Sequence, residues 1–356
     1  MSYKSPTEDF KYNLAMLNYD EVIAGIEKFK EYDSETLMSV VSEIGRLNEQ
    51  EVLDSNKIGD REGLKYVTDG AEGPEVHTPE RFKKLYEAVK ASGYVGATMP
   101  TQYGGGGAPF TTAILAGEIG IAANMAFYMG PGLSHGAMKT ILKKATDELK
   151  DKYLPNLTSG EWMGTMCLTE PQCGTDLGLI KSTAIPKNDH YELTGQKIWI
   201  SFGEHDLTEN IIHLVLARTP DAPEGIKGIS LFLVPKRLDD NSRNTIYCGG
   251  LEHKLGIASS PTCVMNLDNA KGWLVGEKNK GMEAMFLMMN DARLKVGLQG
   301  IAMSEISYQN ALEFAKERKQ MRSVVKDKLD KIIDIIKKNN FNIIAANLNG
   351  TELNKM

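Results

Sequence analysis

The sequence predicts a multi-domain α and β protein in which a helical region is followed by a β region and then by more helix. Before residue 160, apolar residues recur at spacings of three and four, as on one face of a helix. From Trp162 to about residue 268, short runs rich in β-branched and aromatic residues indicate strands, and helical spacing returns from Gly281. A chain of 356 residues is long enough for two or three domains, each with its own core.

The composition excludes several classes of protein. The chain has 41 Lys and Arg against 47 Asp and Glu, a net charge of −6 that argues against non-specific nucleic-acid binding. Residues 1–15 lack the apolar core of a secretory signal, and eighteen apolar residues never run together, so we expect a cytoplasmic protein without a membrane span. The cysteines and histidines lack metal-ligand spacing, so we expect no metal, and packing roles for the four cysteines, Cys167, Cys173, Cys248 and Cys263.

The first two regions are expected to be helical. Residues 1–75 read as a helical N-terminal extension that ends in a Gly- and Asp-rich loop at 59–75. Its helical spacing is carried by Leu37, Val40, Val41, Ile44 and Leu47. Residues 76–160 form the next helical domain, in which Thr78 is the expected helix cap and Pro79 the first-turn residue. Further helices are predicted over 111–124 and 133–144.

The middle region, residues 161–275, is expected to form a compact antiparallel β domain. Its strand-like runs are 163–169, 191–202, 211–217, 229–235 and 262–268.

The last regions are a partial helical domain, 276–322, and a divergent tail, 323–356. One long helix is predicted from Gly281 to Lys319, with Met282, Met285, Phe286 and Met289 on one face. This methionine stripe either lines an acyl pocket, because thioethers adapt to a flexible chain, or forms ordinary helix core. The tail holds six Lys, six Ile and six Asn in 34 positions, an abrupt shift in composition.

Two segments of the middle region carry the chemistry. Met166 to Gly178 reads MCLTEPQCGTDLG, a strand-like run that ends in a turn rich in Gly, Thr and Asp. Such turns present backbone N–H groups to a phosphate or to the edge of a flavin. About twenty residues later, Trp199 and Ser201 offer a flat ring and a hydroxyl on one face of a strand. Together the two segments predict a flavin site.

The same segments resemble the acyl-CoA dehydrogenase family, whose hallmark is Thr-Glu-Pro, two variable residues and Gly-Ser/Thr-Asp, followed by a Trp-Ile-Thr/Ser strand. The resemblance runs from about Glu75 to Arg322, and it is greatest to the larger members, which include 3-methylmercaptopropionyl-CoA dehydrogenases. It implies a middle β barrel, an FAD cofactor, an acyl-CoA substrate, electron-transferring flavoprotein as partner and a homo-oligomer. It also implies that the chain is C-terminally truncated, so oligomerisation is in doubt.

The resemblance assigns residues to the cofactor and the substrate. The FAD-binding positions are Met166, Cys167, Leu168, Thr169, Gly174, Thr175, Trp199, Ile200, Ser201, Arg318 and Gln320. Thr175, Asn290 and Arg293 are the substrate-binding positions. Trp199 would cover a flavin face, although a strand Trp taken alone would be read as core. Glu170 and Asp176 are expected to shape the loop rather than act as bases.

The implied reaction is α,β-dehydrogenation, in which a carboxylate removes the α-proton and hydride passes from the β-carbon to the flavin. In most of the family the base is a Glu on a later helix, for which the tail offers no matching motif. In a minority it directly precedes the Arg that corresponds to Arg293, a position held here by Ala292. Asp291 is the remaining candidate, but it lies about 100° around the helix from that position. We therefore expect weak or absent activity.

Two alternatives remain open from the sequence. One is a non-catalytic remnant that binds flavin or acyl-CoA, and the other is an acyl-CoA oxidase, which shares these motifs. The methionine stripe and the branch resemblance favour a short acyl chain that can contain sulfur.

Overall fold

The computed structural model describes residues 2–318 and residue 334. The chain divides into a large unit, Tyr3–Glu305, and a small unit, Met1–Ser2 with Ile306–Met356. In the small unit the backbone N–H of Ser2 donates to Oδ1 of Asn310 at 3.2 Å. The predictions for Gln320 and, apart from residue 334, for the tail 323–356 fall outside the described residues.

The N-terminal extension is helical, as predicted. Its elements are α1 (Thr7–Met16), α2 (Tyr19–Val22), α3 (Ser34–Leu47) and α4 (Leu53–Glu62). Asp33 caps α3 by accepting a hydrogen bond from the N–H of Thr36, and Leu37 and Val41 are buried on its inner face. The predicted loop at 59–75 was only partly right, because α4 continues to Glu62 and a short hairpin follows. Its strands are β1 (Lys65–Val67) and β2 (Glu75–His77).

The next three helices are α5 (Glu80–Ala91), α6 (Phe110–Lys144) and α7 (Asp147–Ser159). The prediction that Thr78 caps α5 was wrong. Pro79 occupies the N-cap position, and the N–H and hydroxyl of Thr78 both donate to the carboxylate of Asp206. Thr78 therefore binds the segment before α5 to the middle domain, and it does not cap the first turn of α5.

Helix α6 is interrupted where two helices were predicted. Asn124 has φ −155° and ψ 92°, outside the helical region, and its side-chain oxygen accepts the N–H of Phe127. Its side-chain amide donates to Oγ of Ser55 in α4 at 2.8 Å. The second predicted helix thus begins earlier than residue 133. By length and composition α6 could cross a membrane, but 61% of its most apolar window is buried inside the protein, as in a core helix.

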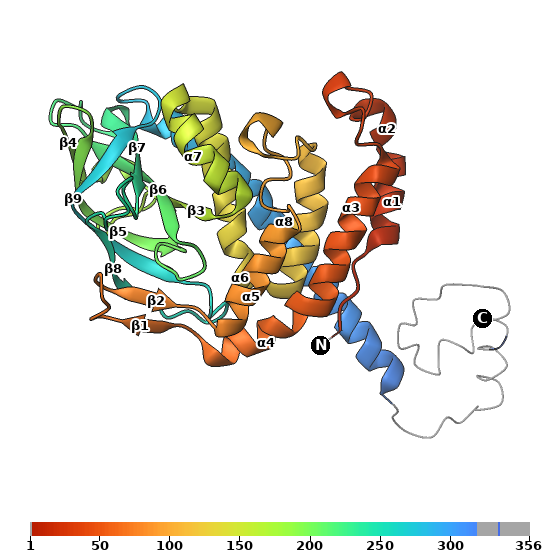
Figure 1. Ribbon diagram of the computed structural model, residues 1–356. Coiled ribbons are helices and arrows are strands. Elements are labelled where there is room, and N and C mark those ends of the chain that lie inside the picture. Colours follow the sequence, from red (N-terminus) through yellow and green to blue (C-terminus); the bar gives the residue numbers. More distant parts are fainter. Residues whose placement is uncertain (1, 319–333, 335–356) are drawn as a thin grey trace. The chain divides into compact units, whose positions relative to one another are not determined.

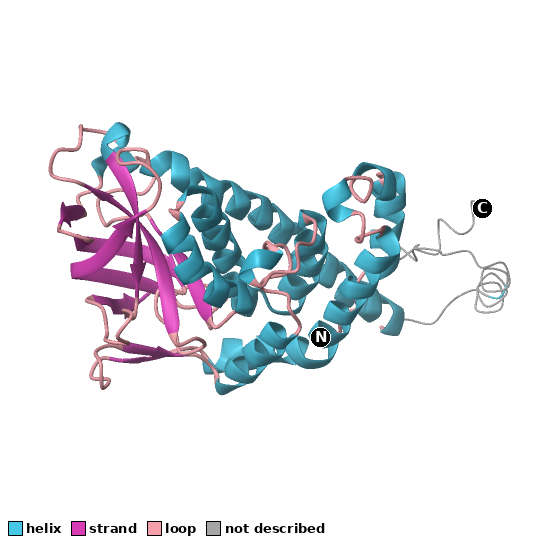
Figure 2. Ribbon diagram, turned by 45° about the horizontal axis from the view of Figure 1, so that its top comes forward, coloured by secondary structure: helices cyan, strands magenta, loops and turns pink. Residues whose placement is uncertain are grey.

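Seven strands form the sheet of the middle region: β3 (Trp162–Cys167), β4 (Thr183–Pro186), β5 (Tyr191–Ser201), β6 (Asn210–Arg218), β7 (Ile229–Pro235), β8 (Ile246–Leu251) and β9 (Thr262–Leu274). Their order is β3-β6-β4-β5-β9-β7, with β8 paired to β9 and a further pairing of β6 with β7. Within the large unit the strands gather on one side and the helices on the other (Figures 1 and 2).

The prediction of a purely antiparallel sheet needs correction, because β3 and β4 each run parallel to β6. Parallel neighbours need a long connection, and the segment from β3 to β6 provides one because it contains the β4–β5 hairpin. Closure of the sheet into a barrel stays a prediction.

The long predicted helix is α8 (Gly281–Glu317). Met285 and Met288 are almost completely buried, whereas Phe286 is 40% exposed. Of the four residues of the predicted stripe, Met285 is buried, Met282 and Met289 are partly exposed and Phe286 is exposed, so the stripe acts as core only at Met285.

Candidate functional site

Three contacts fasten the Thr169 segment to strand β5. The N–H of Ile198 donates to the carbonyl of Thr169 at 2.9 Å. Nζ of Lys197 lies 2.7 Å from Oε1 of Glu170 and 3.1 Å from the carbonyl of Leu168. These bonds bring the two motif segments together, so that residues about thirty positions apart form one surface.

The carboxylate of Glu170 is buried and fully engaged. Its two oxygens also accept the backbone N–H groups of Lys181 (2.6 Å) and Ser182 (3.1 Å). Burial by itself would raise the pKa of Glu170, but attraction to Lys197 and these hydrogen bonds outweigh it and lower the pKa to about 2. Glu170 therefore shapes the turn as an anion, in line with the loop-shaping role expected for it.

Trp199 is presented outward by an irregularity in β5. The pairing of β5 with β9 shifts register between Lys197 and Ile200, and Trp199 has a φ of 62°. Its side chain is 52% exposed, whereas Ile200 beside it is buried. A non-glycine residue in the left-handed region at a bulge is uncommon and costs backbone energy, and such residues cluster at functional sites. The core interpretation of Trp199 is therefore wrong.

The turn after Thr169 is open to solvent. Gly174 and Thr175 are exposed, and a side chain on Gly174 would place its Cβ 3.3 Å from Cγ2 of Thr169. Met166 is partly exposed on β3, and Cys167 faces the core, where burial raises the pKa of its thiol to about 11. Cys167 could thus contribute to a ligand site only through its backbone. All four cysteines are buried and free, as expected for packing roles.

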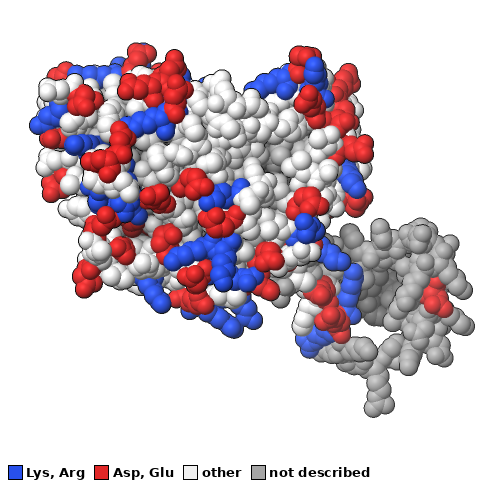
Figure 3. Space-filling model, viewed as in Figure 1, with Lys and Arg blue, Asp and Glu red and all other residues white. Residues whose placement is uncertain are grey.

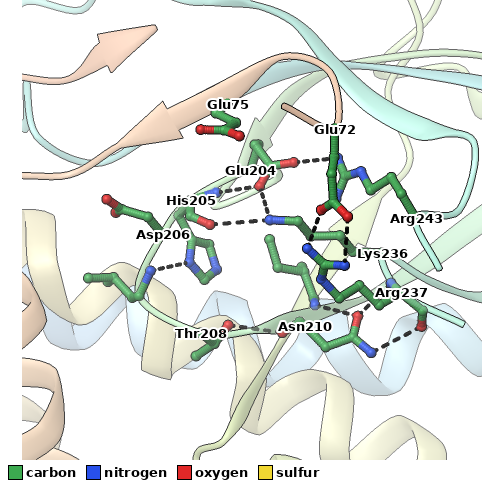
Figure 4. Close-up of polar contacts among 12 residues, drawn as sticks. Glu72, Glu75, Glu204, His205, Asp206, Thr208, Asn210, Lys236, Arg237 and Arg243 are labelled. Atoms are coloured by element: carbon green, nitrogen blue, oxygen red, sulfur yellow. Dashed lines mark hydrogen bonds and ion pairs between the residues drawn. The ribbon is translucent and has the colours of Figure 1, made fainter. Parts of the chain in front are cut away.

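A second polar cluster fixes the loop that follows Ser201 (Figure 4). The buried carboxylate of Glu204 accepts hydrogen bonds from Nζ of Lys236 and, at 2.7 Å, from Nη2 of Arg243. Arg237 pairs with Glu72 in the β1–β2 hairpin. A crevice of about 200 Å³ lies among these side chains, and its lining has more carboxylates than cations. The cluster therefore anchors the hairpin and the loop and does not suit an anion.

His205 in this loop is neutral. The N–H of Leu207 donates to its Nδ1 at 3.2 Å, so Nε2 carries the hydrogen. Burial, with a further contribution from Lys236, lowers the pKa of His205 to about 3.

A small apolar pocket of about 70 Å³ lies between α6 and α8. We call it the α6–α8 pocket. Met129, Leu133, Ala292 and Val296 contribute apolar groups to its lining, and Nε2 of Gln299 donates to Sδ of Met129 at 3.2 Å. The pocket places Ala292, the position considered for a catalytic base, against an apolar space.

Asp291 belongs to a buried charged cluster next to this pocket. Its carboxylate lies 2.7 Å from Nζ of Lys139 and 2.6 Å from Nζ of Lys295. Lys295 also donates to Nδ1 of His135 at 2.9 Å, and Nε2 of His135 lies 2.6 Å from the hydroxyl of Thr98. Burial lowers the pKa of His135 to about 4, so the ring is neutral at pH 7.

These contacts argue against Asp291 as a base. Burial would raise its pKa, but the contact with His135 and the attraction of Lys295 and Lys139 overcome burial and hold the pKa far below the ordinary range of a carboxyl group. A carboxylate stabilised in this way has little tendency to accept a proton.

The remaining predicted residues lie elsewhere. Asn290 and Arg293 are exposed on α8, where Nη1 of Arg293 donates to Oδ1 of Asn290 at 3.0 Å. Arg318 is exposed at the end of the described range 2–318, in the small unit. The structure thus brings together Thr169, Gly174 and Trp199.

Sequence reasoning missed Lys197 and the cluster around Asp291. Lys197 could have been found, because strand alternation from Leu193 places it on the buried face, where a lysine needs a partner.

Comparison with known proteins decides the family. Residues 65–161 match the N-terminal domain of acyl-CoA dehydrogenases, and residues 165–270 match the middle domain. The chain belongs to the acyl-CoA dehydrogenase family. The resemblance inferred from the motifs is therefore confirmed.

Among curated acyl-CoA dehydrogenases, the chain is 42% identical over 330 residues to the 3-methylmercaptopropionyl-CoA dehydrogenase of Ruegeria pomeroyi, with 91% of this chain and 55% of that protein covered. It is 34% identical to the broad-specificity linear acyl-CoA dehydrogenase FadE5 of Mycobacterium tuberculosis, with 89% and 53% covered. The chain thus spans about half the length of these relatives.

Solved acyl-CoA dehydrogenases share the fold. The butyryl-CoA dehydrogenase of Megasphaera elsdenii superposes with a TM-score of 0.68 at 23% identity, covering 85% of this chain and 75% of that one. An acyl-CoA dehydrogenase of Bacillus anthracis complexed with FAD superposes with a TM-score of 0.68 at 24% identity, covering 83% and 46%. The helical N-terminal domain, the sheet and the helix that follows are therefore the acyl-CoA dehydrogenase fold.

Proposed function

We propose that this chain provides the flavin and acyl-CoA site of an FAD-dependent dehydrogenase that acts on short acyl-CoA thioesters. The observation that carries the proposal is the junction of the Thr169 segment with β5, which presents Trp199 beside an open Gly-Thr turn. Strand β7 pairs with both β6 and β9, which supports closure of the sheet into the barrel expected behind this site.

The residues at this junction fit FAD. The exposed indole of Trp199 is suited to cover a ring face, and Gly174 leaves room for close approach of a ligand to the backbone. Thr169 and Ser201 are partly exposed and carry hydroxyls, while Met166 lies on an end strand of the sheet. We assign these five residues and Thr175 to FAD binding, with Leu168 and Ile200 contributing backbone. When bound, FAD would supply the acceptor for a hydride from the substrate β-carbon.

The α6–α8 pocket supports a short acyl chain. An apolar cavity of about 150 Å³ holds benzene, so about 70 Å³ corresponds to roughly three heavy atoms. Two relatives are named butyryl-CoA dehydrogenases, and another is named for 3-methylmercaptopropionyl-CoA, which agrees with a short chain. The thioether of Met129, which accepts a hydrogen bond from Gln299, offers a polarisable lining for a sulfur-containing chain.

Neither position considered for the catalytic base is suited to removing the α-proton. Asp291 is held as an anion by Lys139 and Lys295, and Ala292 has no titratable group. We therefore propose that the chain binds FAD and acyl-CoA but dehydrogenates weakly or not at all. We also propose, from the sequence, a cytoplasmic protein. A solved structure of similar fold is titled for the electron transferring flavoprotein of Acidaminococcus fermentans, which supports electron-transferring flavoprotein as the electron acceptor.

The test is an absorption spectrum of the purified chain reconstituted with FAD, before and after anaerobic addition of butanoyl-CoA. The proposal expects a flavin spectrum that shifts on butanoyl-CoA binding but bleaches slowly. Rapid bleaching would show that an effective base is present, and hydrogen peroxide formed in air would identify an oxidase. Failure to retain FAD would overturn the proposal.

A further inference from the structure

The acidity of the chain is concentrated in the extension that precedes the matched family domains. Residues 1–64 hold seven Lys and Arg against fourteen Asp and Glu, a net charge of −7. The rest of the chain holds 34 against 33 and is close to neutral. Figure 3 shows acidic side chains along the edge of the large unit formed by α1–α3. This charge distribution creates a local negative potential on one helical segment.

A groove of about 680 Å³ runs between α1, α2 and α3. We call it the N-terminal groove. Its lining repeats at helical spacing on both walls, with Lys11, Leu14 and Ala15 on α1 and Glu35, Met38, Ser39 and Ser42 on α3, and Asn18 lies at the start of α2. Leu14, Tyr19 and Met38 are at most 5% exposed and form an apolar floor. Two parallel rows of this kind form the trough into which a third helix packs.

Exposed apolar side chains are concentrated in the extension that carries the groove. In the described part of the chain, seventeen large apolar side chains are exposed, and six of them fall in the first forty residues: Tyr12, Met16, Leu17, Val22, Ile26 and Val40. A concentration of exposed apolar side chains with a polar rim marks an interaction surface.

Two carboxylates on the rim have no ion-pair partner among the residues that the structure describes. Glu21 lies on α2 and Glu35 on α3, so they flank the groove from different helices. The neighbouring Asp20 differs, because its carboxylate accepts the N–H and hydroxyl of Ser34. Glu21 and Glu35 are therefore free to pair with cations on a ligand.

We propose that the N-terminal groove docks a basic amphipathic helix of a partner protein. The apolar face of such a helix would cover the floor at Leu14 and Met38, and lysines or arginines beside that face would pair with Glu21 and Glu35. This is helix-in-groove recognition with charges at the rim. A second copy of this chain fits poorly, because two extensions of charge −7 repel each other.

The test uses a fluorescein-labelled peptide of leucine and lysine, patterned as a basic amphipathic helix, and fluorescence anisotropy with the full chain. We expect saturable binding that weakens with added salt. A peptide with the same leucine face and glutamine in place of lysine should bind at least about tenfold more weakly.

Variants separate the groove from general attraction to an acidic surface. E21Q/E35Q should weaken binding of the basic peptide about tenfold, whereas E31Q/E62Q, which removes two exposed carboxylates outside the groove, should change it less than about twofold. Ser39→Trp, at an exposed position in the groove, should block binding by occupying the trough. Circular dichroism and thermal unfolding of each variant check that the fold is intact.

Three results would overturn the proposal. The first is absence of saturable binding, and the second is equal weakening by the two double variants. The third is light scattering that shows a dimer broken by Ser39→Trp, because the occupant would then be a second copy of this chain.

Discussion

Glu170 and Lys197 form an ion pair beneath the candidate flavin site, with Oε1 and Nζ 2.7 Å apart and both side chains almost completely buried. Glu170 follows Thr169 directly, and Lys197 precedes Trp199 by two residues. The pair therefore joins the two segments that would contact the flavin, and its integrity should determine both stability and the alignment of the site.

Breaking the Glu170–Lys197 ion pair should strongly destabilise the fold. Glu170→Gln leaves the charge of Lys197 buried and unpaired, and we expect a loss of about 3 to 5 kcal/mol in the free energy of unfolding. The double variant E170Q/K197M should be less destabilised than E170Q, because no charge is left alone. Urea unfolding followed by circular dichroism measures the wild type, E170Q, K197M and E170Q/K197M. Additive losses would contradict a direct interaction between the two side chains.

Acid should lower the free energy of unfolding by protonating Glu170. The pKa of Glu170 is about 2 in the folded chain, against about 4.3 for an unperturbed glutamate. Because the folded pKa is the lower one, the contribution is fully present above pH about 4.3 and is lost as the pH falls towards 2, in total about 3 kcal/mol. Urea midpoints between pH 5 and pH 2 should fall more steeply for the wild type than for E170Q/K197M. Parallel curves would rule out Glu170 as the titrating group.

Removing the exposed indole should affect ligand binding more than folding. Trp199→Ala deletes a side chain that is 52% exposed, so stability should change by less than about 1 kcal/mol. The affinity for FAD should fall about tenfold, because an aromatic surface for the ring system is lost. Titration of the apoprotein with FAD measures the change. Ile226→Ala, at a position that is 54% exposed, is the control and should bind FAD like the wild type.

A carboxylate at Ala292 should supply a base at the α6–α8 pocket. In Ala292→Glu the new side chain starts at the lining of the α6–α8 pocket, and it should accelerate bleaching of bound flavin by butanoyl-CoA about a hundredfold or more. Stopped-flow absorbance under anaerobic conditions measures the rate. Leu294→Glu puts the same charge on an exposed position and should have no effect. Unchanged bleaching in FAD-bound Ala292→Glu would place the acyl chain elsewhere.

The sequence predicted the parts of the fold that have strong local patterns. Strands β5, β6, β7 and β9 lie close to the predicted runs because Val, Ile and aromatic residues repeat there. Strands β1 and β2 have only three residues each, too few to show alternation. The parallel pairing of β3 with β6 was missed because it joins segments almost fifty residues apart.

In the candidate site, too, the sequence predicted residues in local motifs and missed contacts between distant residues. Thr169 and Trp199 could be selected because each stands in a recognisable local motif. The cluster of Asp291 with His135 joins residues 156 positions apart, and a local sequence pattern cannot predict such a contact. That cluster turned the remaining candidate base into a structural anion, a change that only the folded geometry could reveal.

The interruption of α6 at Asn124 ties the N-terminal extension to the part of the chain that matches the family. The amide of Asn124 donates to Ser55 while its oxygen replaces a lost helical bond at Phe127. Removing residues 1–64 would take a hydrogen-bond partner from a buried amide in the middle of the 35-residue helix α6. The extension is therefore an integral part of the helical core, and trimming it or exchanging it as a separate module should destabilise α6, which lines the α6–α8 pocket.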